Sequence, residues 1–136
     1  MPINFKIVTP AGLSIEDTVD QVTVDTADGQ ITVLPEHTPI LSVLASGEAM
    51  VKKGEGETSY AIFGGFLEVK KGSEVTILAD GAESGLEIDE EKVKEAIARG
   101  EELKKQKASM DSEEYARVAA ALERDMARLR VLRRRK

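Results

Sequence analysis

Cysteine and tryptophan are absent from this chain of 136 residues, and His37 is its single histidine. Without cysteine there are no disulfide bonds and no thiolate zinc site, which fits a reducing compartment. Acid–base, nucleophilic and metal catalysis each need a cluster of polar groups, and the sequence holds no Gly-x-Ser-x-Gly turn. Glu90 and Glu91 are typical of the first turn of a helix. We therefore expect a non-catalytic protein that requires no metal or cofactor, with His37 packed or in an interface.

Long hydrophobic runs are also absent. No apolar stretch approaches the roughly 20 residues that a membrane-spanning helix needs. Residues 1–6 lack the charged start and apolar run of a signal peptide. Hydrophobic residues make up 41% of the chain and charged residues 32%, which indicates a folded protein. We expect any association with a membrane to come through a partner.

Aromatic residues are scarce, and the net charge of -6 is unevenly spread. Residues 124–136 hold seven basic residues and one acid, so residues 1–123 carry a net charge of -12. An acidic body with five aromatic residues argues against nucleic-acid binding. The basic end is consistent with a solvated helix terminus or with a surface that meets an acidic partner.

The first 80 residues show the spacing of strands. Apolar residues alternate with polar ones, and β-branched residues are enriched, at 5–7, 22–24, 31–33, 67–69 and 75–77. Turn signals such as Ser46-Gly47 and Gly54-Glu55-Gly56 recur between them. The pattern predicts an antiparallel β-sandwich or flattened barrel of about ten short strands over residues 1–84.

Helical spacing replaces the strand pattern after Ile88. Asp89 is a good N-cap for a first helix to about residue 107, and 108–110 make a short connection. Asp111 and Glu114 offer a capping box for a second helix, so 88–136 should form an antiparallel helical hairpin. Gly100 permits close approach of the helices. Because the facing stripes are rich in Ala and Gly, the hairpin should be held modestly and be able to open, a static hairpin being the alternative.

Residues 28–39 combine a tight turn, a strand and a rigid corner. Asp28-Gly29 suits a two-residue hairpin turn, because Gly supplies a positive φ and Asp tolerates one. The returning strand follows at 30–34. Pro35 and Pro39 fix their own φ and restrict the residues before them, so 36–38 should form a stiff, extended corner, here called the proline corner (35–39).

This turn, strand and Leu-Pro-x-His-x-Pro corner resemble the epsilon subunit of F-type ATP synthases, the counterpart of the mitochondrial delta subunit. Residues 62–69, Ile-Phe-Gly-Gly-Phe-Leu-Glu-Val, and residues 75–80, Val-Thr-Ile-Leu-Ala-Asp, are similar to two further segments of that family in order and spacing. The resemblance covers essentially the whole chain. It implies a non-catalytic subunit of the rotating central stalk, placed on the cytoplasmic face of the bacterial inner membrane through its complex.

The resemblance also implies partners for particular residues. In that family the sandwich binds the gamma subunit and the c-ring, and the helical pair inhibits ATP hydrolysis in the alpha/beta catalytic head. By position, Asp28, Gly29 and Gln30 correspond to the loop that meets the c-ring. The face turned towards gamma includes Pro35, His37 and Pro39. Basic residues of the second helix meet an acidic segment of the beta subunit, and the candidates here are Arg117, Arg124, Arg128 and Arg130.

Some members of the family bind ATP through an Ile/Leu-Asp-x-x-Arg-Ala motif as a regulatory ligand. Here the matching residues are Ile88, Asp89 and Lys92, followed by Val93. Lysine in place of arginine replaces a bidentate donor by a point charge, which disfavours ATP binding. A different class of function also fits the residues, namely a free-standing β-sandwich binding module whose helical hairpin forms a dimer.

Overall fold

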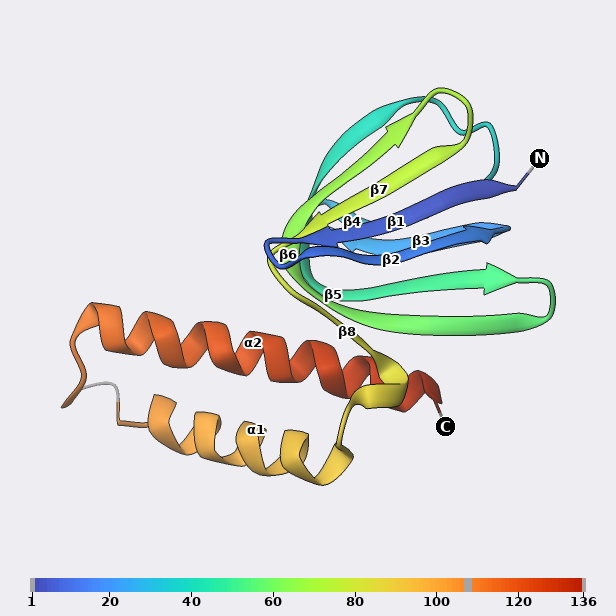
Figure 1. The fold of residues 1–136 in the computed structure, drawn as a ribbon. Helices are drawn as coiled ribbons and strands as arrows, with labels where there is room; N and C mark the ends of the chain where they lie inside the picture. The colour runs from blue at the N-terminus through green and yellow to red at the C-terminus, as the bar shows by residue number, and fades with distance from the viewer. Residues whose placement is uncertain (1, 107–108, 136) are drawn as a thin grey trace.

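The N-terminal part of the chain is a β-sandwich, and the C-terminal part is a pair of helices that extends from beneath it (Figure 1). The computed structural model describes residues 2–106 and 109–135. The strands are β1 (Ile3–Thr9), β2 (Gly12–Val19), β3 (Gln21–Thr26), β4 (Gly29–Val33), β5 (Ile40–Lys53), β6 (Gly56–Lys70), β7 (Glu74–Ala79) and β8 (Ala82–Ser84). A short 3-10 helix, η1 (Gly85–Glu87), then leads to α1 (Glu90–Lys104) and α2 (Ser112–Arg135).

The strands form one sheet in the order β2-β1-β7-β6-β5-β3-β4, with β8 paired to β6. The sheet folds over on itself because β5 and β6, of 14 and 15 residues, run through both layers. The described residues form eight strands, fewer than about ten, since the expected turn at Ser46-Gly47 lies inside β5. A glycine is needed there because a Cβ at Gly47 would collide with the carboxylate of Asp25.

The β-sandwich expected from the sequence is confirmed, with two differences in its topology. The sheet is not closed into a barrel, and β2 and β4 are its edges. One pair, β1 with β7, is parallel. Parallel neighbours need a long crossover, which strands β2 to β6 supply here. The alternation of apolar and polar residues within each strand does not indicate which strands pair, so the sequence did not predict this parallel pair.

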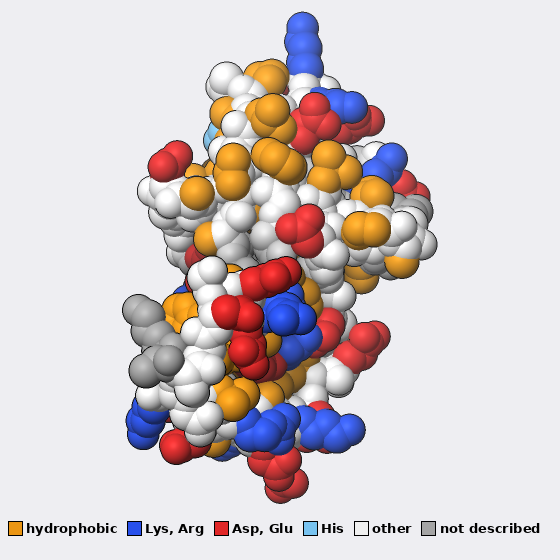
Figure 2. Space-filling model, turned by 90° about the vertical axis from the view of Figure 1, so that its left-hand side faces the viewer, with side chains coloured by type: hydrophobic (Ala, Val, Ile, Leu, Met, Phe, Trp, Pro, Cys, Tyr) orange, Lys and Arg blue, Asp and Glu red, His pale blue; other side chains and the backbone are white. Residues whose placement is uncertain are grey.

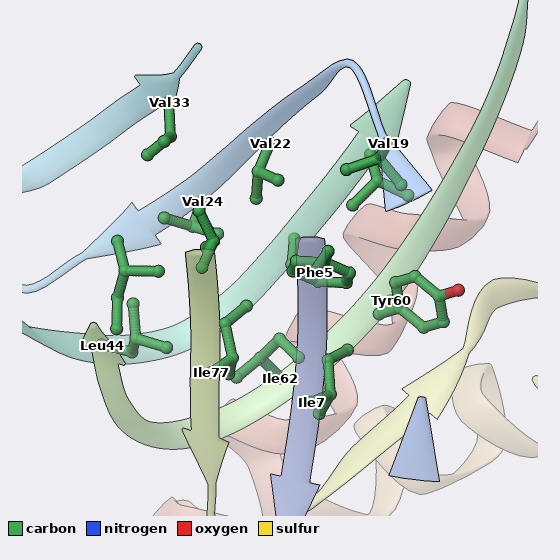
Figure 3. Close-up of a cluster of buried hydrophobic side chains, with 14 of the residues drawn as sticks. Phe5, Ile7, Val19, Val22, Val24, Val33, Leu44, Tyr60, Ile62 and Ile77 are labelled. Atoms are coloured by element: carbon green, nitrogen blue, oxygen red, sulfur yellow. The ribbon is translucent and has the colours of Figure 1, made fainter. Parts of the chain in front are cut away.

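Apolar side chains from both layers meet in the sandwich core. Phe5 and Ile7 of β1 lie at its centre, and Ile77 of the neighbouring strand β7 lies beside Ile7, its register partner (Figure 3). Burial alternates along the short strands, so that every second residue of β1 and β7 points into the core. Buried side chains of this kind stabilise a fold by about 1.5–3 kcal/mol each.

The two helices begin where the caps predict. The Asp89 carboxylate accepts a hydrogen bond from the backbone N–H of Lys92 at 3.2 Å, and Asp111 accepts one from Glu114 at 2.7 Å. Helix α1 ends at Lys104, earlier than expected, and residues 107 and 108 lie outside the described part of the chain. The helices run antiparallel, and a Cβ at Gly100 would lie 3.1 Å from Leu122 of α2, which confirms the close approach.

Candidate interaction surfaces

One outer face of the sandwich carries exposed hydrophobic side chains, which we call the apolar patch (Leu41, Val43, Phe66 and Leu78). They are 70%, 55%, 48% and 45% exposed, respectively. Val43 of β5 is the register partner of Phe66 in β6, and Phe66 is the partner of Leu78 in β7, so these side chains share one face. Figure 2 shows a side of the molecule on which hydrophobic side chains gather over the sandwich while charged ones cover the helices below.

The predicted turn at 28–30 joins β3 to β4, but its centre is one residue earlier. Ala27 and Asp28 form the turn, and Gly29 begins β4 with a φ of 126°. Thr26 holds the turn, because its hydroxyl accepts a hydrogen bond from the backbone N–H of Asp28 at 3.2 Å and donates one to the carbonyl of Gly29. Asp28, Gly29 and Gln30 are all exposed, which leaves the turn accessible.

The proline corner lies at the opposite end of β4 from this turn. The backbone N–H of His37 donates a 3.2 Å hydrogen bond to the carbonyl of Leu34, which closes a tight turn. Glu36 has a φ of 64°, so the expectation of an extended segment at 36–38 is wrong for this residue. Pro35 followed by a residue of positive φ is typical of a type II turn. The sequence does not predict this turn, because glycine usually occupies the position that Glu36 holds here. Pro39 then leads into β5.

His37 is half-buried in this corner. Its Nδ1 lies 2.6 Å from the backbone carbonyl of Thr38, which is a local turn hydrogen bond. A packed histidine that satisfies turn hydrogen bonds is thus what the structure holds. Among the described residues, no group of three or more His, Asp or Glu side chains is arranged to hold a metal ion.

The three residues of the implied ATP motif come together at one pocket. Ile88, Asp89 and Lys92 line a cavity of about 530 Å³ between β8, α1 and α2, with Arg99 and Arg128 among its other lining residues. Ile88 is buried, whereas Asp89 and Lys92 are exposed. These three residues lie close together because they flank the start of one helix.

The four candidate arginines of α2 divide into two pairs. Arg117 and Arg124 are exposed. Arg128 donates hydrogen bonds of 2.8 Å from Nε and from a terminal nitrogen to the two carboxylate oxygens of Glu83, and one of 2.6 Å to Asp125. The hydrogen bonds to Glu83 are the main reason that the pKa of the Arg128 guanidinium is raised. Partial burial lowers this pKa, and the hydrogen bond to Asp125 raises it further. Arg130 donates a 2.8 Å hydrogen bond to Asp25 in β3.

The hairpin also contacts the sandwich through a small apolar cluster. Its buried members are Ala61 of β6, Ile88, Val93 of α1, and Val131 and Leu132 of α2. The guanidinium of Arg128 lies 4.7 Å from the ring centre of Phe63, which packs against this cluster. The second helix, more than the first, therefore attaches the hairpin to the sandwich.

The apolar patch and the acidic partners of the arginines were not predicted from the sequence. A signal for the patch exists, because Phe66-Leu67 and Ile77-Leu78-Ala79 place apolar residues on both faces of their strands. No local signal exists for the pairing of Glu83 with Arg128, which lie 45 residues apart.

Comparison with known proteins identifies the family. The family model described as ATP synthase, Delta/Epsilon chain, beta-sandwich domain matches residues 2–85. The ATP synthase epsilon chain of Herpetosiphon aurantiacus is 40% identical over 131 residues, which are 96% of this chain and 94% of the relative. This chain belongs to the ATP synthase delta/epsilon family. The family assignment made from the motifs at 28–39, 62–69 and 75–80 is thus confirmed.

Two further similar proteins agree over most of the chain. The epsilon chain of Levilactobacillus brevis is 37% identical, with 95% of this chain and 93% of the relative covered. A chain of the mitochondrial ATP synthase structure of Euglena gracilis, which comprises OSCP, F1 and the c-ring, matches with a TM-score of 0.81 at 26% identity. That match covers 93% of this chain and 78% of the other. None of the described helices is long and apolar enough to span a membrane.

Proposed function

We propose that this chain is the non-catalytic epsilon subunit of the ATP synthase rotor, in which residues 1–84 bind gamma and the c-ring and residues 88–136 regulate ATP hydrolysis in the alpha/beta head. The observation that carries the proposal is the apolar patch, on a chain of the delta/epsilon family. The subunit performs no chemistry of its own and requires no cofactor. Its place is at the cytoplasmic face of the bacterial inner membrane, held there by the rotor.

The apolar patch is the proposed docking surface for gamma. Contiguous exposed apolar side chains on a soluble protein mark an interface, because they cost free energy while they face water. Leu41 comes two residues after Pro39, so the patch continues into the proline corner. Leu34, on the other side of the corner, is 54% exposed. Patch and corner together would form the face turned towards gamma, with His37 inside it.

The turn at 28–30 is the proposed contact with the c-ring. It lies at the far end of β4 from the proline corner, so one short strand of five residues separates the two contacts. A strand paired on the sheet is stiff, and a stiff link between gamma and the c-ring suits a part that carries torque. Asp28 and Gln30 offer exposed polar groups for this contact.

Regulation is assigned to the hairpin because its attachment to the sandwich is small. Among the described residues, a cluster of five buried apolar residues, one of them alanine, and two ion pairs hold it in place. A shift of a two-state equilibrium from 1:99 to 99:1 takes about 5.5 kcal/mol of differential binding. Contacts of a released α2 with an acidic segment of the beta subunit would supply energy of this order through Arg117, Arg124, Arg128 and Arg130.

ATP would be an additional ligand of the pocket lined by Ile88, Asp89 and Lys92. The residues present fit it poorly, because Arg128 already donates to two carboxylates and Lys92 offers only a point charge. We expect no heat of binding when the full chain is titrated with ATP at micromolar concentration in a calorimeter. A saturating heat signal that is lost in Lys92→Ala would establish ATP as a regulatory ligand.

The test of the docking proposal is co-purification with gamma. Phe66→Ser should reduce the recovery of the chain on gamma at least tenfold, because a large apolar contact becomes polar. The fold should survive, since Phe66 is 48% exposed. Leu86→Ser is the matched control, because Leu86 is 81% exposed in η1, outside the patch. Equal recovery of the Phe66→Ser and control proteins would contradict the proposal.

A further inference from the structure

Two carboxylates of the sandwich hold two arginines of α2. Glu83 of β8 accepts both hydrogen bonds of a bidentate pair from Arg128, each 2.8 Å long. Asp25 of β3 accepts a 2.8 Å hydrogen bond from Arg130. Bidentate, charge-assisted pairs are the strong members of their class, about twice as strong as neutral hydrogen bonds. The charged contacts between hairpin and sandwich are thus concentrated on the last third of α2.

The surroundings of both carboxylates fix them in place. Glu83 pairs in register with Ala61 of β6, so its backbone belongs to the sheet. The Asp25 carboxylate also accepts hydrogen bonds from the backbone N–H of Glu48 at 2.9 Å and from the side chain of Gln30 at 3.3 Å. Asp25 is 17% exposed in its side chain, which keeps it oriented towards α2. The sandwich therefore presents its acids in a rigid arrangement before α2 arrives.

The same arginines are among those that the proposed function assigns to an acidic partner. A guanidinium has five donors in one planar fork, and Arg128 uses three of them on Glu83 and Asp125. Arg128 cannot bind a carboxylate of another chain in a bidentate pair until its ion pair with Glu83 is broken. Arg117 and Arg124, in contrast, are exposed in the docked hairpin and free to meet a partner first.

We propose that Glu83 and Asp25 form an intramolecular substitute for the acidic partner surface, and that release of the hairpin is an exchange of one set of carboxylates for another on Arg128 and Arg130. This inference rests on the proposed function, which supplies the acidic partner. Each ion pair that is broken in the exchange is replaced by another. The net free-energy cost of release therefore comes mainly from loss of the small apolar cluster of Ala61, Ile88, Val93, Val131 and Leu132. Exposed Arg117 and Arg124 make the first contact, and Arg128 and Arg130 follow.

The exchange predicts different effects for two substitutions that break the same ion pair. If the ion pair only held the hairpin on the sandwich, the two substitutions would have the same effect. Glu83→Gln removes the sandwich acid and leaves Arg128 paired with Asp125 of its own helix, so the hairpin releases and the donors that Glu83 held are available to the catalytic head. Arg128→Gln breaks the same ion pair, so the hairpin also releases, but the arginine is lost to both partners. Both variants should therefore loosen the hairpin, while their effects on inhibition of ATP hydrolysis should be opposite.

Release is measured on the full-length isolated chain. Ala45 and Glu123 line one groove between β5 and α2, and the chain has no native cysteine, so Ala45→Cys with Glu123→Cys reports docking through disulfide formation. Glu83→Gln, Asp25→Asn and Arg128→Gln should each slow this disulfide about tenfold. Glu16→Gln is the control, because Glu16 of β2 pairs with Lys6 of β1, within the sandwich. Oligoglutamate should slow the disulfide in the unsubstituted background, and oligolysine should not.

Inhibition is measured on the reconstituted ATP synthase. Glu83→Gln should deepen the inhibition of ATP hydrolysis several-fold, and Arg128→Gln should weaken it. Disulfide rates equal to those of the control would overturn the exchange and leave the proposed function standing. Faster release with no change in hydrolysis for either variant would overturn it as well, and would place the failure in the assigned regulatory function.

Discussion

The backbone N–H of Glu36 donates a 2.7 Å hydrogen bond to the hydroxyl of Ser73, 37 residues later in the chain. Both residues have a positive φ, 64° and 61°, and Ser73 is only 3% exposed. The carbonyl of Ser73 accepts a further bond, from the N–H of Asn4 at 2.9 Å. A buried serine thus ties the proline corner to the start of β1 and to the turn before β7.

Replacing Ser73 by alanine should loosen the proline corner. The substitution leaves the N–H of Glu36 without its acceptor, which costs about 1–2 kcal/mol of unfolding free energy. Ser73→Gly is the companion variant, because it removes the same hydroxyl while relieving the backbone strain. Hydrogen exchange at the Glu36 amide should accelerate in both variants, and denaturant unfolding should show the larger loss for alanine. Unchanged protection of that amide would contradict the assignment.

Gly65 should tolerate no side chain. Its φ is 131°, and a Cβ there would lie 2.9 Å from the carbonyl carbon of Leu78 and overlap its oxygen, both of which are backbone atoms. Gly65→Ala should cost about 3 kcal/mol or more, since strain and collision add. Gly72→Ala is the control, because Gly72 has a φ of 89° with open space around it. That variant should lose about 1–2 kcal/mol in urea unfolding, and equal losses would refute the collision.

The contact of α1 with α2 at Gly100 should tolerate a methyl group but not a larger side chain. A Cβ there would lie 3.1 Å from the end of the flexible Leu122 side chain. Gly100→Ala should be near neutral, because alanine gains about 1 kcal/mol of helix propensity against this crowding. Gly100→Leu should separate the helices and lower the thermal stability of the hairpin. Circular dichroism of both variants measures this, and equal melting curves would count against the close approach.

Tyr60 should ionise later than a free tyrosine. Burial, and then the negative charge of Asp17, raise the pKa of its phenol above 10.0. The stability that neutral Tyr60 contributes is therefore present below pH 10 and is lost as the pH rises through the folded-state pKa. In a Tyr115→Phe background, absorbance of tyrosinate follows Tyr60 alone, and Asp17→Asn should shift the titration towards lower pH. Ionisation at or below pH 10 would be the contrary result.

Features with a local cause could be predicted from the sequence. Asp89 and Asp111 cap the helices because each cap is defined within four residues, and Gly100 was correctly assigned to a close helix contact. Alternation located the strands of the sandwich. The predicted position of the turn at Asp28-Gly29 was wrong by one residue. The turn lies at Ala27-Asp28, where hydrogen bonds of the Thr26 hydroxyl close it.

Features that depend on distant residues could not be predicted. Gly47 looked like a turn, but it is glycine because Asp25, 22 residues away, occupies the space of a side chain. Glu36 adopts a positive φ because Ser73 receives its N–H. The parallel pairing of β1 with β7 and the ion pair of Glu83 with Arg128 arise only when the chain folds back on itself.

The most direct measurement of the regulatory role is ATP hydrolysis by the synthase assembled with this chain ending at Ile88. The residues left cover the whole matched sandwich, 2–85, including the apolar patch, so assembly should proceed. The account predicts a normal content of the shortened chain in the purified complex and faster hydrolysis than with the full chain. An equal rate in complexes that hold the shortened chain would contradict it.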